Sequence, residues 1–201
     1  MGRAGDQYRL FDAPLSFPNG FVYRPDFLTP REEERFVAEF ESLPFEDATY
    51  QEYTARRRII NFGWGFEFDQ DQPRSGPPLP TFLLPLQKKV AKWLDVPVAR
   101  VVEALVTEYQ PGTPIGWHRD RDIFESVVGV SLSGWCDMQL RPLQAASPAK
   151  PLTVSLEPRS AYLMQGESRW QWQHHIPPTK TLRYSITFRT LPKGVETPTA
   201  K

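Results

Sequence analysis

The three histidines of this 201-residue chain all lie in two short segments whose residue types suit a metal site. The first segment contains His118 and Asp120, and the second contains the adjacent pair His174 and His175. One histidine and one nearby carboxylate, joined by a distant second histidine, form the ligand set that holds Fe(II) on one face and leaves other positions open. Because histidine occurs nowhere else, we expect it to do chemistry here.

Strand geometry selects among these residues. In an extended chain residues i and i+2 point to the same face, so His118 and Asp120 project together. The same rule separates the adjacent histidines. The face of His174 carries Trp170, Trp172 and Ile176, whereas the face of His175 carries Arg169, Gln171 and Gln173. We therefore predict that His174 faces inward as the ligand and His175 points outward, unless a bulge reverses the parity.

A strand with one apolar and one polar face follows the second histidine. Its polar face carries Arg183, Ser185, Thr187 and Arg189, which alternate with Tyr184, Ile186 and Phe188. A solvent-exposed strand could have this pattern, and an isolated His-x-Asp is a weak signal. The closeness of this strand to the second histidine favours a shared cavity, in which an arginine can clamp a carboxylate through two parallel hydrogen bonds.

Taken together, these segments resemble the AlkB group of Fe(II)/2-oxoglutarate dioxygenases. The family pattern is H-x-D, a distal His and an R-x5-R strand, and its positions are His118, Asp120, His174, Arg183 and Arg189. Tyr109-Gln110-Pro111-Gly112 matches the family's Y-x-P-G, and Gly166-Glu167-Ser168-Arg169 precedes the distal histidine as expected. The resemblance covers roughly residues 20 to 192.

The resemblance implies a role for each matching residue. Fe(II) would be held by His118, Asp120 and His174. The cosubstrate 2-oxoglutarate would bind Arg183 with help from Tyr109 and Ser185, and Arg189 would lie nearer the metal, by the other carboxylate or the substrate. The chain departs from the pattern at Thr107 and Ser185, where members often have asparagine. Both residues can still form hydrogen bonds, so we expect cosubstrate binding to persist.

Arginines and aromatic residues interleave between Tyr50 and Pro80. Arg57-Arg58 followed by Phe62-Gly63-Trp64 is similar to the segment near the substrate lid of many members of the family. Such a mixture suits a surface that touches phosphates and stacks bases. The alternation of Phe62, Trp64, Phe66 and Phe68 is equally typical of a half-buried hairpin. The predicted substrate-binding residues are Arg57, Arg58, Trp64 and Trp117.

The expected function is oxidative demethylation of N-alkylated nucleobases in DNA or RNA, as in repair, with O2 consumed and formaldehyde, succinate and CO2 released. One alternative is the same chemistry on a protein side chain or small metabolite. Another, less favoured, is a jelly roll that only binds a partner. Lys+Arg and Asp+Glu are balanced at 24 each, which counts against gripping duplex nucleic acid chiefly by phosphate neutralisation.

Composition indicates a soluble enzyme with one domain. The single Cys136 excludes an intramolecular disulfide and fits a reducing cytoplasm. We see no signal peptide and no apolar run long enough to cross a membrane, so we expect a cytoplasmic protein. Its oligomeric state is open, with a monomer favoured.

We expect a mainly β, α+β fold: a double-stranded β-helix, or jelly roll, with buttressing N-terminal helices and a substrate lid. The single domain 1–201 divides into an extension (1–19), helices and lid (20–100), a catalytic core (101–192) and a flexible tail (193–201). A capping box at Thr29–Glu32 starts a helix that Pro44 ends, and a second helix spans Thr81–Asp95. The predicted core strands are 101–109, 126–133, 138–141, 153–156, 160–164, 169–176 and 182–190.

Overall fold

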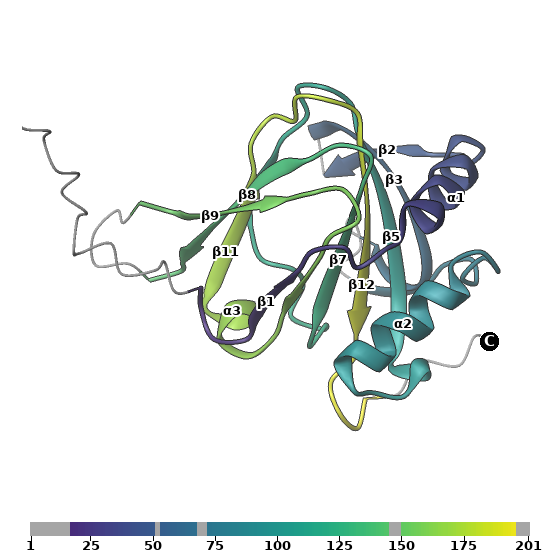
Figure 1. Cartoon of the computed structure of the whole chain (residues 1–201). Helices are drawn as coiled ribbons and strands as arrows, with labels where there is room; N and C mark the ends of the chain where they lie inside the picture. The colour runs from purple at the N-terminus through teal and green to yellow at the C-terminus, as the bar shows by residue number, and fades with distance from the viewer. Residues whose placement is uncertain (1–16, 51–52, 68–71, 145–149, 196–201) are drawn as a thin grey trace, which may run out of the picture.

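Two antiparallel β-sheets face each other, and two helices cover the outer face of the larger sheet (Figure 1). The computed structural model describes residues 17–50, 53–67, 72–144 and 150–195. It shows the jelly roll that the sequence predicted. No helix among these residues is long and apolar enough to cross a membrane.

The larger, major sheet has the order β1-β10-β7-β12-β5-β3-β2, with β4 paired to β3. Its strands are β1 (Phe21–Arg24), β2 (Glu46–Tyr50), β3 (Tyr53–Glu67), β4 (Gln72–Ser75), β5 (Val101–Tyr109), β7 (Val127–Leu132), β10 (Ala161–Met164) and β12 (Arg183–Thr190). The central strand β12 pairs along most of its length with β5 on one side and β7 on the other.

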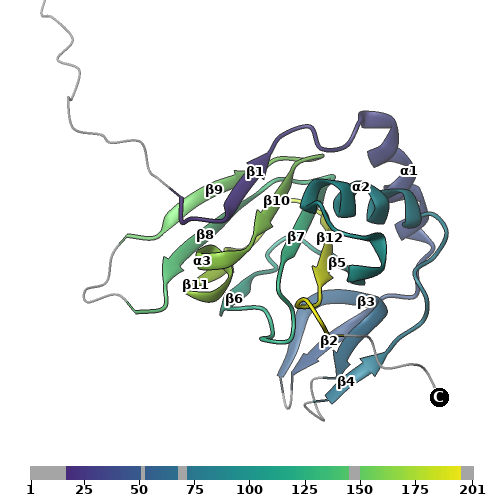
Figure 2. The same cartoon turned by 90° about the horizontal axis from the view of Figure 1, so that it is seen from below.

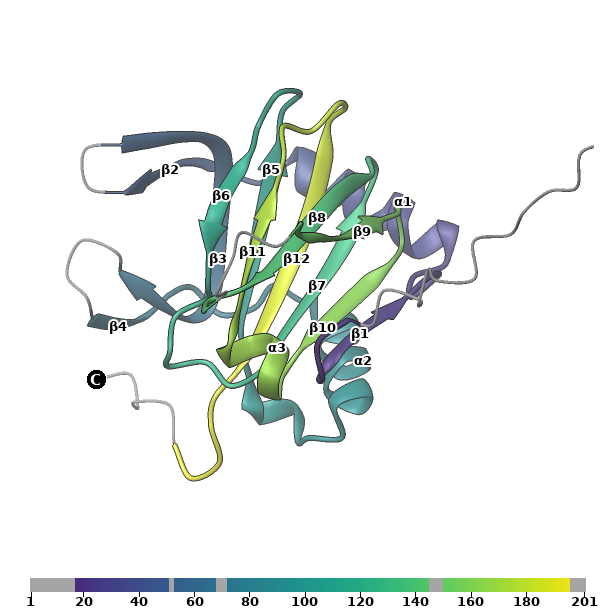
Figure 3. The ribbon, with the colours of Figure 1, turned by 90° about the vertical axis from the view of Figure 1, so that its left-hand side faces the viewer.

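The smaller, minor sheet has the order β6-β11-β8-β9 and lies in front of the major sheet in Figure 3. Its strands are β6 (Ile115–His118), β8 (Cys136–Pro142), β9 (Leu152–Leu156) and β11 (Trp172–Ile176). A core of apolar side chains fills the space between the sheets, from Met138, Leu140 and Ile176 on the minor sheet to Tyr109, Val127, Tyr162 and Met164 on the major sheet.

The helices are α1 (Pro30–Glu41) and α2 (Leu84–Leu94), and a 3-10 turn (Val98–Arg100) leads into β5. The predicted capping box begins α1: Thr29 Oγ1 accepts from the Glu32 amide at 3.2 Å, and the Glu32 carboxylate accepts from the Thr29 amide at 2.7 Å. Phe36 and Phe40 of α1 pack with Leu86 and Val90 of α2 on the outer face of the major sheet. The helices therefore buttress the sheet, as predicted.

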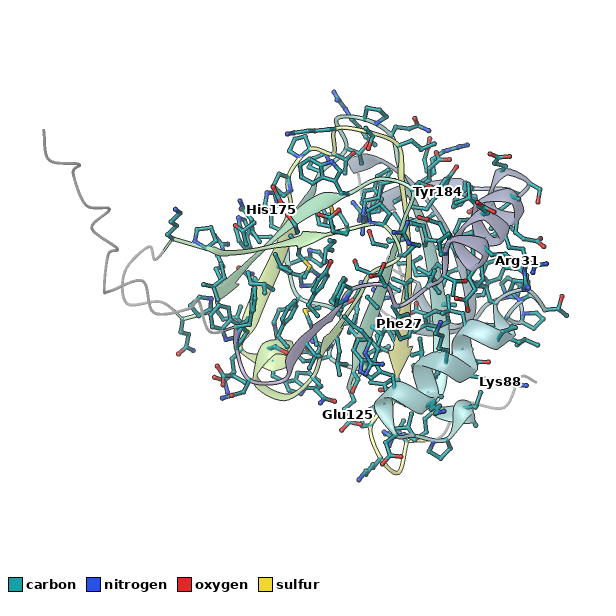
Figure 4. The ribbon with its side chains drawn as sticks, in the orientation of Figure 1. Phe27, Arg31, Lys88, Glu125, His175 and Tyr184 are labelled. Atoms are coloured by element: carbon teal, nitrogen blue, oxygen red, sulfur yellow. The ribbon has the colours of Figure 1, made fainter. Side chains whose placement is uncertain are left out.

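Strand β12 shows why this arrangement follows from the sequence. Its apolar residues Tyr184, Ile186 and Phe188 all belong to the core beneath the helices. Because side chains alternate along a strand, its arginines and hydroxyls face the minor sheet instead. We call this side of the major sheet its inner face. In Figure 4, Tyr184 marks the helix-covered side.

The structure corrects one predicted strand and adds others. Residues expected to begin a strand at Arg169 instead form a short helix, α3 (Gly166–Trp170), and β11 begins only at Trp172. Hydrogen bonds between Ser168 Oγ and the backbone of Gln165 close this turn. The strands β1 and β6, of four residues each, were not predicted.

The predicted lid corresponds to β3 with its partners β2 and β4, at the end of the major sheet opposite β1 (Figure 2). β3 pairs with β5 over Arg58–Gly63 and continues to Glu67 beside β4. Gly63 has φ of +82°, and a Cβ there would lie 2.2 Å from the Val102 carbonyl oxygen. Glycine is therefore required where β3 turns from β5 toward β4. Phe68 lies outside the described residues.

Candidate metal and cosubstrate site

His118 and His174 lie opposite each other on paired strands. They are register partners in the antiparallel pair β6 and β11, and their ring centroids are 4.1 Å apart. His118 Nδ1 lies 2.8 Å from the Gly116 carbonyl oxygen. A carbonyl can only accept, so this nitrogen carries the proton, which leaves the lone pair on Nε2 for a ligand.

Asp120 completes the constellation from the loop that follows β6. Its Oδ2 lies 3.7 Å from His174 Nε2, and the carboxylate is almost fully buried. Its other oxygen, Oδ1, accepts two hydrogen bonds from Arg189, at 2.8 Å from Nε and 2.5 Å from Nη2. Arg189 thus occupies one oxygen of Asp120 and leaves the other directed toward the histidines.

The protonation states of these groups suit a cation. Burial lowers the pKa of His174 to about 3, and burial also lowers the pKa of His118. Burial alone would raise the pKa of Asp120, but the positive charge of Arg189 holds it below its usual range. At neutral pH the site therefore presents two neutral imidazoles and one carboxylate, the protonation states that metal ligands need.

Arg189 is held between two acids. Besides Asp120, its Nη1 donates to Glu103 Oε2 at 2.6 Å from the neighbouring strand β5. Glu103 is buried, which raises its pKa, while the charge of Arg189 opposes that shift. We did not predict Glu103 as a site residue. Its sequence signal was present: Glu103 is one of two carboxylates in the otherwise largely apolar strand Val101–Tyr109, and it is paired with Arg189 of β12.

A second buried arginine supports Asp120 from behind. Arg169 of α3 is only 2% exposed, and its Nη2 donates to the carbonyl oxygens of Arg121, at 2.5 Å, and Phe124, at 2.9 Å. These two residues belong to the loop directly after Asp120. The sequence analysis placed Arg169 on an outward strand face, and that was wrong because the α3 turn directs it inward.

His175 lies on the opposite face of β11 from His174, as the parity argument predicted (Figure 4). Its ring stacks on Trp117 with centroids 5.1 Å apart, and its Nδ1 lies 2.5 Å from the Ile115 carbonyl oxygen. Arg141 covers the Trp117 ring at 4.2 Å. Trp117, predicted as a substrate contact, thus belongs to a stack on the far side of the minor sheet from the two facing histidine rings.

Arg183 forms the other end of the inner face. It is 1% exposed, donates from Nε to Ser131 Oγ at 3.1 Å and lies over the Tyr109 ring at 4.9 Å. Its buried Nη1 has no hydrogen-bond partner among the described residues. Arg169 also has buried nitrogens without a partner among the described residues, but at Arg183 the unpaired Nη1 lies with the Ser131 hydroxyl and the Tyr109 ring on the inner face, so this end fits a carboxylate.

Hydroxyl groups line the surface between the two arginines. Ser185 of β12 is paired with Thr107 of β5 on one side and Ser131 of β7 on the other, and all three are buried. The sequence analysis predicted Thr107 and Ser185 but missed Ser131. Its signal was a serine at an inward position of the otherwise apolar strand Val127–Leu132.

The donor set fits a divalent transition metal, and the Arg183 end fits the far carboxylate of a dicarboxylic acid. Within the described ranges, no three side chains of His, Cys, Asp or Glu are close enough together to coordinate one metal ion as they stand. Metal binding would have to bring the side chains of His118, Asp120 and His174 closer together. The ligand roles of the triad therefore remain a prediction.

The three predicted substrate residues of the lid lie in different environments. Arg57 projects from β3 toward the inner face, and its charge adds to the lowering of the His118 pKa that burial causes. Arg58 points the other way and forms two hydrogen bonds with Glu108, at 2.8 and 2.9 Å. Trp64 is buried and its ring meets Phe124 edge-on at 6.0 Å. The substrate-binding roles of these three residues stay predictions.

Comparison with known proteins agrees with this geometry. Residues 20–189 match the family description "2OG-Fe(II) oxygenase superfamily". The "Alkylated DNA repair protein ALKBH8 homolog" of Arabidopsis thaliana is 27% identical over 191 residues, which cover 84% of this chain and 53% of the plant protein. A mimivirus protein, "Uncharacterized protein L905", is 26% identical over 87% of this chain and 86% of its own length.

Two further similarities define the limits of the comparison. The Xenopus tropicalis "tRNA (carboxymethyluridine(34)-5-O)-methyltransferase alkbh8" is 29% identical over 82% of this chain but only 26% of its own length. This chain thus spans about half of the plant relative and a quarter of the frog one. Among solved structures, "The structure of OsALKBH1" superposes with a TM-score of 0.67 at 15% identity and covers 87% of this chain and 98% of that one.

The match over residues 20–189, the relatives and the shared fold agree with one another. The chain belongs to the 2OG-Fe(II) oxygenase superfamily and is an AlkB-like oxidoreductase that uses Fe(II), 2-oxoglutarate and O2.

Proposed function

We propose that this chain oxidatively demethylates N-alkylated nucleobases in DNA or RNA, with iron held by His118, Asp120 and His174. In this proposal Arg183 binds the far carboxylate of 2-oxoglutarate, with Tyr109, Thr107 and Ser185 along its length. The observation that carries the substrate class is the placement of Arg57 in β3: it alternates with Arg58, which lies over Phe45 on the helix-covered side, so Arg57 projects toward the inner face. A cation beside the reaction centre suits a polyanionic substrate.

Names of the relatives support the same class. One is described as an alkylated DNA repair protein and another as a tRNA methyltransferase. Both descriptions apply to longer proteins, so the common element is a nucleic-acid substrate rather than a particular base or reaction. Net charge is zero, so binding would depend on local cations such as Arg57 rather than on an overall positive field.

The protein's residues contribute placement and protonation. Bound Fe(II), with 2-oxoglutarate and O2, supplies the oxidising power to hydroxylate an unactivated C–H bond. His118 and His174 stay neutral, and Asp120 stays ionised, so the ligand set needs no proton release before it can bind metal. Arg189 and Arg169 fix Asp120 and its loop. Hydroxylation of an N-methyl group gives a hemiaminal that breaks down to the free base and formaldehyde.

The same chemistry on a protein side chain or small metabolite is the second candidate, and the zero net charge favours it. The mass of each candidate substrate before and after reaction separates the two, because formaldehyde is released in both cases. The protein is incubated with Fe(II), 2-oxoglutarate, ascorbate and a panel of N-methylated DNA and RNA oligonucleotides, and the products are read by mass spectrometry. Loss of a methyl group from any oligonucleotide supports the proposal. If 2-oxoglutarate is consumed and no oligonucleotide changes, the nucleic-acid proposal fails and the second candidate is favoured.

Arg57 and Arg58 provide a matched pair for the binding test. Arg57→Ala should weaken oligonucleotide binding and reduce its salt dependence by about one counterion, because one phosphate contact is lost. Arg58→Ala should leave that slope unchanged, because the Arg58 side chain lies on the helix-covered side of the sheet, over Phe45 and beside Glu108. Affinity measured at two salt concentrations for both variants checks this. Equal slopes for the wild type and Arg57→Ala would remove Arg57 from the substrate surface.

A further inference from the structure

Tyr162 of β10 reaches the middle of the inner face, although its strand lies two places from β12 in the sheet. Tyr162 and Gly129 are register partners on β10 and β7, and Gly129 is in turn paired with Thr187 of β12. A Cβ added to Gly129 would lie 2.3 Å from Tyr162 Cε1 and 2.6 Å from its hydroxyl oxygen. The ring therefore lies across the bare backbone of β7 and directs its hydroxyl toward β12.

The register places this hydroxyl between the two arginines. On one side of the Gly129–Thr187 pair lies Ser131, which binds the Arg183 side chain. On the other side lies the pair of Val127 with Arg189, the partner of Asp120. A molecule that extended from Arg183 toward Asp120 along the inner face would have to pass the Tyr162 hydroxyl.

The Tyr162 side chain is largely buried, and its hydroxyl has no hydrogen-bond partner among the residues that the structure describes. Tyr162 is 9% exposed, and its ring stacks at 13° to that of Phe21 with centroids 6.3 Å apart, which holds it from behind. The hydroxyl can therefore form a hydrogen bond with a ligand that lies along the inner face. Arg183 Nη1, at the same surface, is buried and has no partner among the described residues.

We propose that the Tyr162 hydroxyl donates a hydrogen bond to bound 2-oxoglutarate, and that glycine at position 129 is what gives the ring room to do so. This inference rests on the proposed placement of 2-oxoglutarate at Arg183. A donor is the required type of group, because both ends of 2-oxoglutarate carry only acceptor oxygens.

The electrostatic environment supports a donor role. Burial raises the pKa of Tyr162, and the negative charge of Asp120 raises it further, so the phenol keeps its proton at neutral pH. The charges of Arg183 and Arg189 oppose this shift without reversing it. The phenol is therefore protonated where an incoming carboxylate or keto oxygen needs a proton donor.

The test measures cosubstrate binding rather than turnover. Tyr162→Phe keeps the ring and its packing on Phe21 but removes the donor. We expect the Kd for 2-oxoglutarate, measured by calorimetry on protein loaded with Mn(II) in place of Fe(II), to rise about tenfold or more, as for a lost hydrogen bond to a charged group. The Kd for Mn(II) itself should not change.

Tyr184→Phe is the matched control. It removes another buried tyrosine hydroxyl, which donates to Glu108 Oε2 at 3.3 Å on the helix-covered side of the sheet. We expect this variant to bind 2-oxoglutarate like the wild type. A second test variant, Gly129→Ala, should also raise the Kd because the added methyl group displaces the Tyr162 ring.

Three results would overturn the proposal. These are an unchanged or tighter Kd in folded Tyr162→Phe, a tenfold loss in Tyr184→Phe as well, or wild-type binding by Gly129→Ala. A parallel measurement of 2-oxoglutarate binding by Arg183→Lys shows whether such a result concerns Tyr162 alone or the whole proposed position of 2-oxoglutarate. Unchanged binding in Arg183→Lys would show that 2-oxoglutarate lies elsewhere, whereas weaker binding there with no effect of Tyr162→Phe would exclude Tyr162 alone.

Discussion

The two arginines of β12 occupy equivalent positions on one strand face but differ in how completely they are paired. Arg189 donates three hydrogen bonds, two to Asp120 and one to Glu103. Arg183 donates one to Ser131, stacks on Tyr109, and keeps a buried Nη1 without a partner in the described part of the chain. We call the Arg189 end of β12 its complete end, because two acids of the protein pair with that guanidinium. We call the Arg183 end its incomplete end, because one buried nitrogen there has no partner in the described part of the chain.

This difference separates positioning from binding. A guanidinium whose hydrogen bonds are all made to its own protein fixes the geometry of its partners, here the carboxylate of Asp120. A guanidinium with an unpaired buried N–H retains the capacity to bind an anion. The sequence pattern R-x5-R does not distinguish the two, because the deciding partners, Glu103 and Ser131, come from neighbouring strands.

The largest expected effect lies at the metal end. His174→Ala should abolish turnover and weaken Fe(II) binding by more than about 100-fold, beyond the usual cost of losing an outer partner of a metal ligand. His175→Ala should leave Fe(II) binding close to that of the wild type, because His175 stacks on Trp117 on the other face. Anaerobic Fe(II) titration of both variants checks this. The reverse order of effects would refute the assignment of His174.

The sequence predicted those parts of the fold that depend on alternation. The faces of β12, the opposite orientations of His174 and His175, and the capping box of α1 all follow from local periodicity or local hydrogen bonds, and the structure shows each of these features. The ligand role of His174 stays a prediction. The jelly roll was predicted from the regular spacing of strands and from the family resemblance.

Contacts between distant segments account for what was missed. Arg169 was placed outside because alternation was extended through residues that form α3, where helical geometry changes the direction of every side chain. Glu103 and Tyr162 depend on which strands are neighbours, and strand order is not a local property. Trp64 shows the same limit: an alternating aromatic run fits either stacking surface or core, and its contact with Phe124 places it in the core.

Arg183→Lys tests the incomplete end of the comparison. Lysine keeps the positive charge but cannot offer two parallel N–H donors to a carboxylate. We expect the Kd for 2-oxoglutarate to rise about 10- to 100-fold, as for lost hydrogen bonds between charged groups, while Fe(II) affinity stays near that of the wild type. Calorimetry with each ligand gives both values. If Fe(II) affinity fell and cosubstrate affinity did not, the two ends of β12 would have exchanged roles.

Glu103→Gln tests the complete end, with a smaller effect. Arg189 keeps its bonds to Asp120 but loses a charged partner, so we expect Fe(II) affinity to fall about tenfold, the lower end for partners behind a metal ligand. The Kd for 2-oxoglutarate should change less than that for Fe(II). Glu108→Gln is the control, because it removes a buried acid of the same strand that pairs with Arg58 instead. Equal losses in both variants would indicate a general effect on β5.

The smallest expected effect concerns pH and the metal-free protein. Burial lowers the pKa of His174 to about 3 in the folded state, whereas the unfolded chain has its ordinary value of 6.5. The unfolded chain therefore binds the proton more readily, so the contribution of His174 to stability is complete above about pH 6.5 and declines as the pH falls toward 3.

In His174→Gln this contribution is absent at every pH. The free energy of unfolding of the wild type, measured by urea titration without metal at pH 7, 6 and 5, should therefore fall more steeply than that of the variant, by at most about 1.4 kcal/mol per pH unit. Asp120, Glu103 and the other titrating groups are present in both proteins. Their contributions to the pH dependence of the unfolding free energy therefore cancel in the comparison. Parallel curves would mean that His174 is not buried in its neutral form. The metal-free site would then expose His174 to solvent, even though Arg189 already holds the neighbouring Asp120 in place.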